Sequence, residues 1–136
     1  MPWINRLRQV AEEKNFNIFL DPDNGIRLEG RRDRDPRKFV WTQEIEGLLR
    51  IKSDTLLLCF DQSLCRGSEI DDRSEKLEDL GKRGIYAQYY FCSDASILIA
   101  SGSYELLRSW GIEAIALGIP AGRFQLPDPP PPELPE

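Results

Sequence analysis

The sequence predicts a single α/β domain, in which helices flank a mixed β-sheet, followed by a proline-rich tail. Short β-prone apolar segments alternate with longer segments whose apolar residues recur at helical spacing. A chain of 136 residues has the length of one domain with one core. Seven of the ten prolines lie between Pro120 and Pro135, which predicts a folded domain over residues 1–125 and an extended tail over residues 126–136.

The first part of the chain is predicted to form a helix and then a β-hairpin. Residues 2–14 carry apolar side chains at helical spacing, with Pro2 suited to the first turn. Residues 16–20 and 26–30 are β-prone and flank an Asn24-Gly25 pair. Because Asn-Gly between two such segments is the strongest short-range hairpin signal, we expect these two strands to pair with each other.

A second helix is predicted over residues 36–50. Asp35 and Pro36 match an N-cap residue followed by the first helical residue, and Trp41 would share the apolar face of this helix with Ile45 and Leu48. Residues 39–42 fit a short strand equally well. The sequence therefore leaves the start of this helix open.

The next elements are predicted to be a buried strand and a helix. Residues 55–60 form an unbroken apolar run, which is typical of a central strand buried on both faces. Ser68 can cap a helix that ends near Gly81 or Gly84. The residues of this helix expected to face the core are Ile70, Leu77 and Leu80.

The last elements are predicted to be a strand over residues 85–92 and then a βαβ unit that begins with the strand over residues 96–100. Residues 85–92 and 96–100 are rich in β-branched, aromatic or aliphatic residues and are predicted strands. A short helix over residues 104–110 would end at Gly111, and residues 112–117 would form a further strand. Strand, helix and strand in this order predict a right-handed crossover.

Composition narrows the function classes. The chain contains no histidine, which removes the usual general base and the commonest zinc ligand. No apolar run reaches the roughly 18–20 residues of a membrane span, and the first residues do not resemble a secretory signal. We therefore expect a soluble, acidic, cytoplasmic protein without a membrane partner. Its three cysteines, Cys59, Cys65 and Cys92, are expected to be reduced thiols.

A basic cluster is the first candidate binding site. Six of the 18 basic residues lie within residues 27–38. Guanidinium groups bind phosphates bidentately, and a nearby tryptophan offers a stacking surface for single-stranded nucleic acid. The cluster also fits a protein-binding patch or a solvated loop, because acidic residues are interspersed in it. The residues proposed to contact phosphate or nucleic acid are Arg31, Arg32, Arg34, Arg37, Lys38 and Trp41.

The sequence Ser101-Gly102-Ser103 is the second candidate, as an anion site. It lies between a predicted strand and a predicted helix. Ligands of open α/β sheets bind beyond the carboxyl ends of strands, where helix N-termini present unpaired N–H groups. Ordinary capping of the helix accounts for the same three residues.

Residues 97–112 resemble the final βαβ segment of NYN and PIN-like ribonucleases. In that family the strand ends in Ser-Gly-Asp followed by Ser-Asp-Phe, and the aspartates hold a divalent metal. Here Ser103 and Glu105 stand where acids are expected, and Asp61 is the counterpart of the first-strand aspartate. The resemblance implies a degenerate member of a metal-dependent nuclease family.

Carboxylates and thiols supply no complete catalytic or metal site in the sequence. Carboxylates that Mg²⁺ could use are common in an acidic chain, and three thiols without histidine do not make a structural zinc site. We therefore predict no catalytic residue, no metal ligand and no cofactor. The carboxylates considered for a metal site are Asp61, Glu69, Asp71, Asp72 and Asp94.

The function predicted from the sequence is that of a non-enzymatic binding protein. We expect an accessory or regulatory subunit of a cytoplasmic assembly, with a protein partner. A metal-dependent nuclease or phosphate-handling enzyme centred on Asp61, Asp94 and residues 101–103 is the first alternative. A nucleic-acid-binding subunit that uses the basic cluster is the second. Fold class alone does not choose among these functions.

Overall fold

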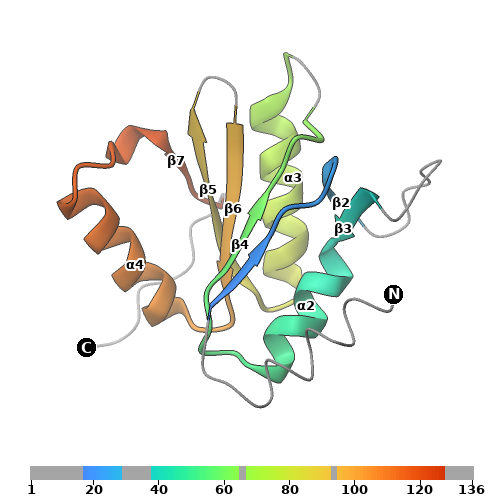
Figure 1. Ribbon diagram of the computed structural model, residues 1–136, viewed down its shortest axis with the longest axis horizontal. Helices are drawn as coiled ribbons and strands as arrows, with labels where there is room; N and C mark the ends of the chain where they lie inside the picture. The colour runs from blue at the N-terminus through green and yellow to red at the C-terminus, as the bar shows by residue number, and fades with distance from the viewer. Residues whose placement is uncertain (1–16, 29–37, 65–66, 93–94, 128–136) are drawn as a thin grey trace.

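The computed structural model describes residues 17–28, 38–64, 67–92 and 95–127 (Figure 1). Its main feature is a five-stranded mixed sheet with the strand order β1-β4-β6-β5-β7. β1 pairs with β4 in parallel, and all other neighbours in this sheet are antiparallel. The strands are β1 (Ile18–Leu20), β4 (Leu57–Phe60), β5 (Tyr86–Cys92), β6 (Ala95–Ser101) and β7 (Phe124–Gln125).

Three described helices lie on the two faces of this sheet. Helices α2 (Thr42–Ile51) and α3 (Glu69–Lys82) lie on one face, and α4 (Tyr104–Ala116) lies on the other (Figure 1). A short 3₁₀ helix, η2 (Ala121–Arg123), connects α4 to β7. The predicted α/β class with a mixed sheet flanked by helices is confirmed. No helix within the described ranges is long and apolar enough to cross a membrane.

The larger core lies between the five-stranded sheet and helices α2 and α3. Leu57, Tyr89 and Leu98 point to this side from three adjacent strands, and each is fully buried. Leu48 and Leu80 meet them from α2 and α3 and are also fully buried. Burying a side chain of this size contributes roughly 1.5–3 kcal/mol, so this layer makes a larger apolar contribution to stability than the smaller cluster beside α4.

The predicted hairpin is wrong. β1 pairs with β4, and β2 (Gly25–Arg27) pairs in parallel with β3 (Phe39–Trp41) in a separate two-stranded sheet. Gly25 has a φ of +118°, and a Cβ placed there would overlap Asp61 Oδ1 and lie 2.7 Å from the backbone nitrogen of Gln62. Gly25 is required for close packing against the loop after β4. The Asn24-Gly25 pair is misleading because a glycine in this position suits a hairpin turn equally well.

The second helix begins later than predicted. Residues 39–41 form β3, the alternative that the sequence left open, and α2 starts at Thr42. The Glu44 carboxylate accepts a hydrogen bond of 3.0 Å from the Trp41 N–H, so the true start is fixed by a residue three positions into the helix. Trp41 therefore belongs to the strand and the cap rather than to the helix face.

The predicted βαβ unit at the C-terminal end is also wrong. Helix α4 continues through Gly111 to Ala116, and residues 112–117 form no strand. Gly111 lies against β5, where a Cβ would be 3.5 Å from the Gln88 side-chain nitrogen. This distance is an ordinary van der Waals contact, and the glycine lies inside the helix and does not end it. The last strand is β7, which runs antiparallel to β5.

Other sequence predictions are confirmed in part. α3 follows Ser68 as expected, and Leu77 and Leu80 are buried, but Ile70 is 66% exposed. β4 lies inside the sheet, with Leu57 and Cys59 buried and Leu58 and Phe60 only partly buried. The predicted helix over residues 2–14 and residues 128–136 of the predicted tail lie outside the described residues.

Candidate functional site

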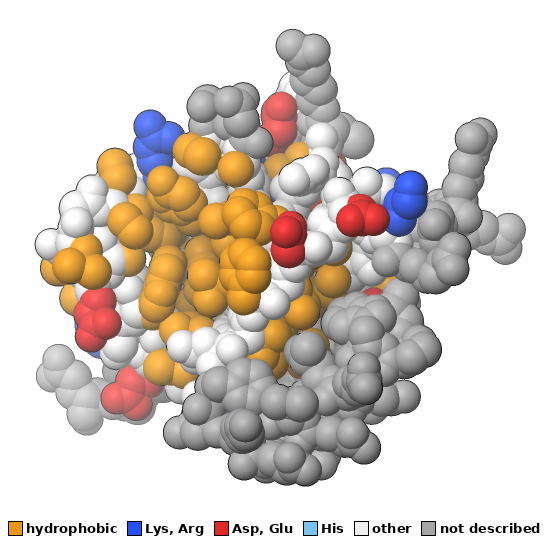
Figure 2. Space-filling model, viewed as in Figure 1, with side chains coloured by type: hydrophobic (Ala, Val, Ile, Leu, Met, Phe, Trp, Pro, Cys, Tyr) orange, Lys and Arg blue, Asp and Glu red, His pale blue; other side chains and the backbone are white. Residues whose placement is uncertain are grey.

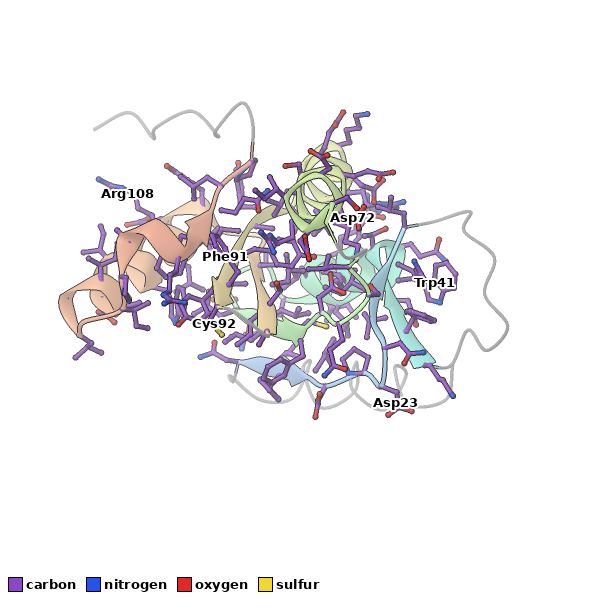
Figure 3. All side chains as sticks on the ribbon, turned by 90° about the horizontal axis from the view of Figure 1, so that it is seen from above. Asp23, Trp41, Asp72, Phe91, Cys92 and Arg108 are labelled. Atoms are coloured by element: carbon purple, nitrogen blue, oxygen red, sulfur yellow. The ribbon has the colours of Figure 1, made fainter. Side chains whose placement is uncertain are left out.

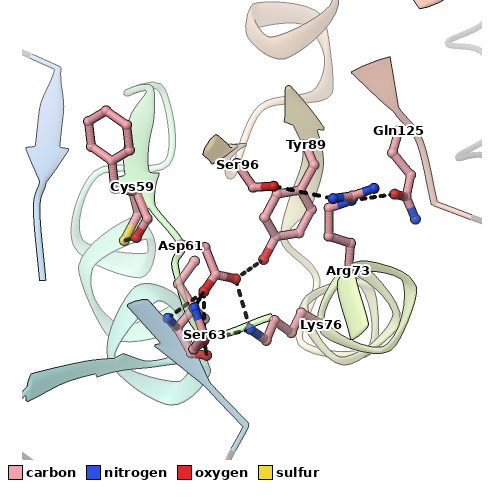
Figure 4. A network of polar contacts seen from close by, with 10 residues as sticks. Cys59, Asp61, Ser63, Arg73, Lys76, Tyr89, Ser96 and Gln125 are labelled. Atoms are coloured by element: carbon pink, nitrogen blue, oxygen red, sulfur yellow. Dashed lines mark hydrogen bonds and ion pairs between the residues drawn. The ribbon is translucent and has the colours of Figure 1, made fainter. Parts of the chain in front are cut away.

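A buried polar network surrounds Asp61, the residue that follows β4 (Figure 4). Its side chain is fully buried. Lys76 Nζ lies 2.8 Å from Oδ2, and the Tyr89 hydroxyl donates to the same oxygen at 2.7 Å. The other oxygen, Oδ1, accepts from the backbone N–H groups of Ile26 at 3.0 Å and Ser63 at 3.1 Å. One carboxylate thus joins β2, β4, α3 and β5.

The Ser63 hydroxyl completes the network. Its oxygen lies 2.9 Å from Lys76 Nζ, 2.6 Å from Asp61 Oδ1 and 2.7 Å from the Ile26 carbonyl oxygen. The hydroxyl accepts from the lysine and donates its single proton to one of the two oxygens. Each buried polar atom therefore has a partner, as expected of a well-ordered network.

The charges in this network are fixed by opposing effects. Burial alone would raise the pKa of the Asp61 carboxyl, but the Lys76 ammonium, together with hydrogen bonds from Lys76, Ser63 and Ile26, holds this pKa below its usual value. Burial, and then the neighbouring Asp61 charge, raise the pKa of the Tyr89 hydroxyl. The ammonium that pairs with Asp61 has no lone pair to accept a proton from Ser63. The Ser63–Lys76 contact therefore does not form a nucleophile–base pair in this state.

The lowered pKa of Asp61 predicts a loss of stability in acid. An unfolded aspartate has a pKa of about 3.9, so below that value the unfolded chain binds a proton that the folded carboxylate resists. The stabilisation is complete above about pH 5 and is lost as the pH falls through the lower folded pKa. Urea unfolding between about pH 6 and about pH 3 should show the wild-type advantage over Asp61→Asn shrinking. A constant difference across this range would contradict the assignment.

Arg73 lies one helical turn before Lys76 and is also buried, with 5% of its surface exposed. Its Nε donates to Gln125 Oε1 at 2.6 Å, and Nη1 donates to Ser96 Oγ at 3.2 Å (Figure 4). Its guanidinium carbon lies 4.5 Å from the centre of the Phe91 ring. All of these partners are neutral.

A hollow of about 870 Å³ opens beside Arg73, beyond the end of β4. Its wall includes the start of α3, the adjoining ends of β5 and β6, and Arg123 of η2. Helix α3 and the short helix η2 thus place a buried cation and a second arginine on one concave surface. The polar side chains that line the hollow are Asp61, Gln62, Glu69, Arg73, Ser96 and Arg123.

The predicted basic cluster is only partly described. Lys38 is exposed, and Trp41 is half-buried in β3. The other four residues, Arg31, Arg32, Arg34 and Arg37, lie outside the described residues. The phosphate-binding role of the cluster therefore stays a prediction.

The residues of the predicted anion site, Ser101, Gly102 and Ser103, make internal contacts. Ser103 Oγ accepts from the Leu106 N–H at 3.2 Å and caps α4. Ser101 Oγ accepts from the Ser103 N–H at 3.0 Å and lies 3.2 Å from the Ser53 carbonyl oxygen. A Cβ on Gly102 would lie 2.7 Å from Ser53 Cβ. The geometry supports the capping interpretation of this segment.

Those carboxylates and thiols from the sequence analysis that lie within the described residues do not come together at one site. Both oxygens of Asp61 are occupied by hydrogen bonds, and Asp94 and Cys65 lie outside the described residues. Within the described ranges, no three carboxylates or cysteines are grouped so that they could hold a metal ion. Burial, with a smaller effect from Asp61, raises the pKa of the Cys59 thiol, which disfavours a reactive thiolate.

An apolar face is the other candidate site. It consists of Phe19, Leu58, Phe60 and Ile97, which lie on the α4 side of strands β1, β4 and β6. Phe19 is 59% exposed and packs edge-to-face on Phe60, with ring centres 5.7 Å apart. The other members are partly exposed. Figure 2 shows hydrophobic side chains gathered in a hollow between α4 and the β1–β4 part of the sheet.

The sequence interpretation missed Lys76, Tyr89, Arg73 and the exposure of the apolar face. A usable signal existed for two of them: Arg73 and Lys76 share the helical face of Leu77 and Leu80, at spacings of three, four and seven residues from Arg73. Basic residues on the apolar face of a helix predict that hydrogen-bonding or charged partners are buried beside them. The exposed face had no such signal, because an apolar strand looks the same whether it is covered or open.

Comparisons with protein-family models, curated proteins and solved structures find no match to this chain.

Proposed function

We propose that this chain is a non-enzymatic binding protein, an accessory or regulatory subunit, which engages a protein partner through the apolar face. The supporting observation is the unequal covering of the sheet. Two described helices, α2 and α3, pack on one face, whereas α4 is the one described helix on the other (Figure 1). In layered α/β domains, apolar sheet faces are buried against another element.

The contrast between the two sides of β4 supports the same proposal. Leu57 and Cys59 point to the α2–α3 side and are fully buried. Leu58 and Phe60 alternate with them, point to the other side and remain partly exposed. Contiguous exposed apolar surface on a soluble domain is typical of a binding site.

The partner that fits is an amphipathic helix with basic residues beside its apolar stripe. The open part of the face lies alongside α4, and a helix that docks next to another on a sheet lies about 8–10 Å from it. Acidic side chains border the hollow in Figure 2, and the chain carries a net charge of -5. Complementary charge favours a basic partner and speeds the encounter.

Changing Phe19 tests the proposal. The tagged full chain, its Phe19→Ser variant and a Leu117→Ser control should be captured from the source cells and compared by quantitative mass spectrometry. Leu117 is 87% exposed and lies at the end of α4, away from the apolar face, so this control removes exposed apolar surface elsewhere. Loss of an aromatic anchor weakens an interface by about 2 kcal/mol or more, roughly 30-fold.

We therefore expect a protein that wild type and Leu117→Ser retain equally and that Phe19→Ser loses. Unfolding in urea should show that Phe19→Ser is folded. Recovery of the same proteins with all three chains, or of none that depends on Phe19, would contradict the proposal.

A further inference from the structure

Arg73 carries a buried charge that forms no direct ion pair among the described residues. Its hydrogen-bond acceptors are the Gln125 amide and the Ser96 hydroxyl, and its ring contact is Phe91. Nη2 donates to no residue within the described part of the chain. An ionised group in a low-dielectric interior is costly unless an opposite charge is near.

The charged groups around Arg73 leave a small excess of positive charge. Asp61 carries one negative charge, and Lys76 binds it directly at 2.8 Å. This pair is neutral, so Asp61 is not available to compensate the charge of Arg73. Glu69, at the start of α3, also lines the hollow and keeps its negative charge while it accepts a hydrogen bond from the Gly67 N–H at 3.1 Å. Arg123 also lines the hollow, so that the lining, with Asp61 paired to Lys76, carries two arginines and one further carboxylate.

The geometry points to a binding site for the oxyanion group of a small molecule, a phosphate or a carboxylate, in the hollow between Arg73 and Arg123. The end of a guanidinium presents N–H groups in a planar fork that matches such oxygens. Ser96 and Gln62 on the wall supply further hydrogen-bonding groups. A volume of about 870 Å³ is in the range of small-molecule sites, so the anionic group would be one end of a larger ligand.

The site is independent of the apolar face. It lies beyond the carboxyl end of β4, and its guanidinium comes from α3 on the opposite side of the sheet from α4. A bound anion would balance the charge of the buried Arg73, which its neutral hydrogen-bond partners do not do. The proposal also requires no covalent step and no metal.

Titration with inorganic phosphate tests the site directly. The ¹⁵N-labelled full chain should be titrated at constant ionic strength, with the Nε–Hε resonance of Arg73 as the reporter. We expect a saturable shift of this resonance, with binding weakened about tenfold in Arg123→Gln. Arg123 is exposed, so its removal leaves the fold intact. Arg108→Gln, on α4 and away from Phe91 in Figure 3, is the matched control and should bind like wild type.

A parallel titration with acetate identifies the class of anion. Saturable binding of phosphate alone assigns a phosphate-bearing ligand, binding of acetate alone assigns a carboxylate ligand, and binding of both anions assigns a site that takes either group. A linear response to both anions would overturn the proposal, as would equal affinity in wild type and Arg123→Gln. Arg73→Lys, which keeps the charge but loses the fork, should also bind more weakly if it folds.

Discussion

Replacing Asp61 by asparagine should lower the free energy of unfolding by about 3–5 kcal/mol, among the largest effects of a single substitution in this chain. Asparagine keeps the shape and an acceptor for the Ile26 N–H, but it removes the charge that pairs with Lys76 at 2.8 Å. The buried ammonium would then lie beside a neutral amide. Equilibrium unfolding in urea measures the loss.

A double variant separates the charge effect from a general packing effect. Asp61→Asn combined with Lys76→Met removes both charges, so much of the lost stability should return. Asp54→Asn, at an exposed aspartate, should change stability by no more than about 0.5 kcal/mol. If the single Asp61 variant were as stable as this control, the network would not be the structural centre that we describe.

Gly25→Ala should destabilise the domain by about 3 kcal/mol or more, because two effects combine. The φ of +118° is strained for any residue with a Cβ, and the added methyl would overlap Asp61 Oδ1 and crowd the Gln62 backbone. The substitution therefore also displaces the carboxylate at the centre of the buried network. Thermal and urea unfolding of the variant measure the loss.

Gly118→Ala is the matched control for backbone strain. Gly118 has a similar φ of +104°, but a Cβ there would meet nothing within 4 Å. This variant should lose only about 1–2 kcal/mol. Equal losses at the two glycines would mean that backbone strain alone matters and that the close approach of β2 to the loop after β4 is unimportant.

Local pattern predicted the elements better than their pairing. The apolar run at residues 55–60 and the stripe of Leu77 and Leu80 predicted β4 and α3, because burial and periodicity act within one segment. The partner of β1 is β4, almost forty residues away, and nothing local encodes that choice. At Gly25, a glycine needed for close packing resembled a glycine needed for a turn, and at Gly111 a glycine inside a helix resembled one that ends a helix.

In the candidate sites, too, local features could be predicted from the sequence and contacts between distant segments could not. Ser103 was a recognisable cap because its bond to Leu106 spans three residues. The Asp61 network joins Ile26, Lys76 and Tyr89, so it exists only after the strands and α3 assemble. Sequence reasoning considered Asp61 as a metal ligand, whereas the fold uses its charge to hold Lys76. The apolar face likewise depends on where α4 lies, which no single segment specifies.

Site-specific photo-crosslinking from the apolar face tests the central claim most directly. A photoreactive phenylalanine analogue at position 19, in the full chain in its source cells, should cross-link to another protein through an amphipathic helix of that partner. The same analogue at position 117 should give no such product. Cross-links from position 19 to residues 2–14 of the same chain, or to a second copy of the chain, would contradict the account, because the apolar face would then be covered without a partner.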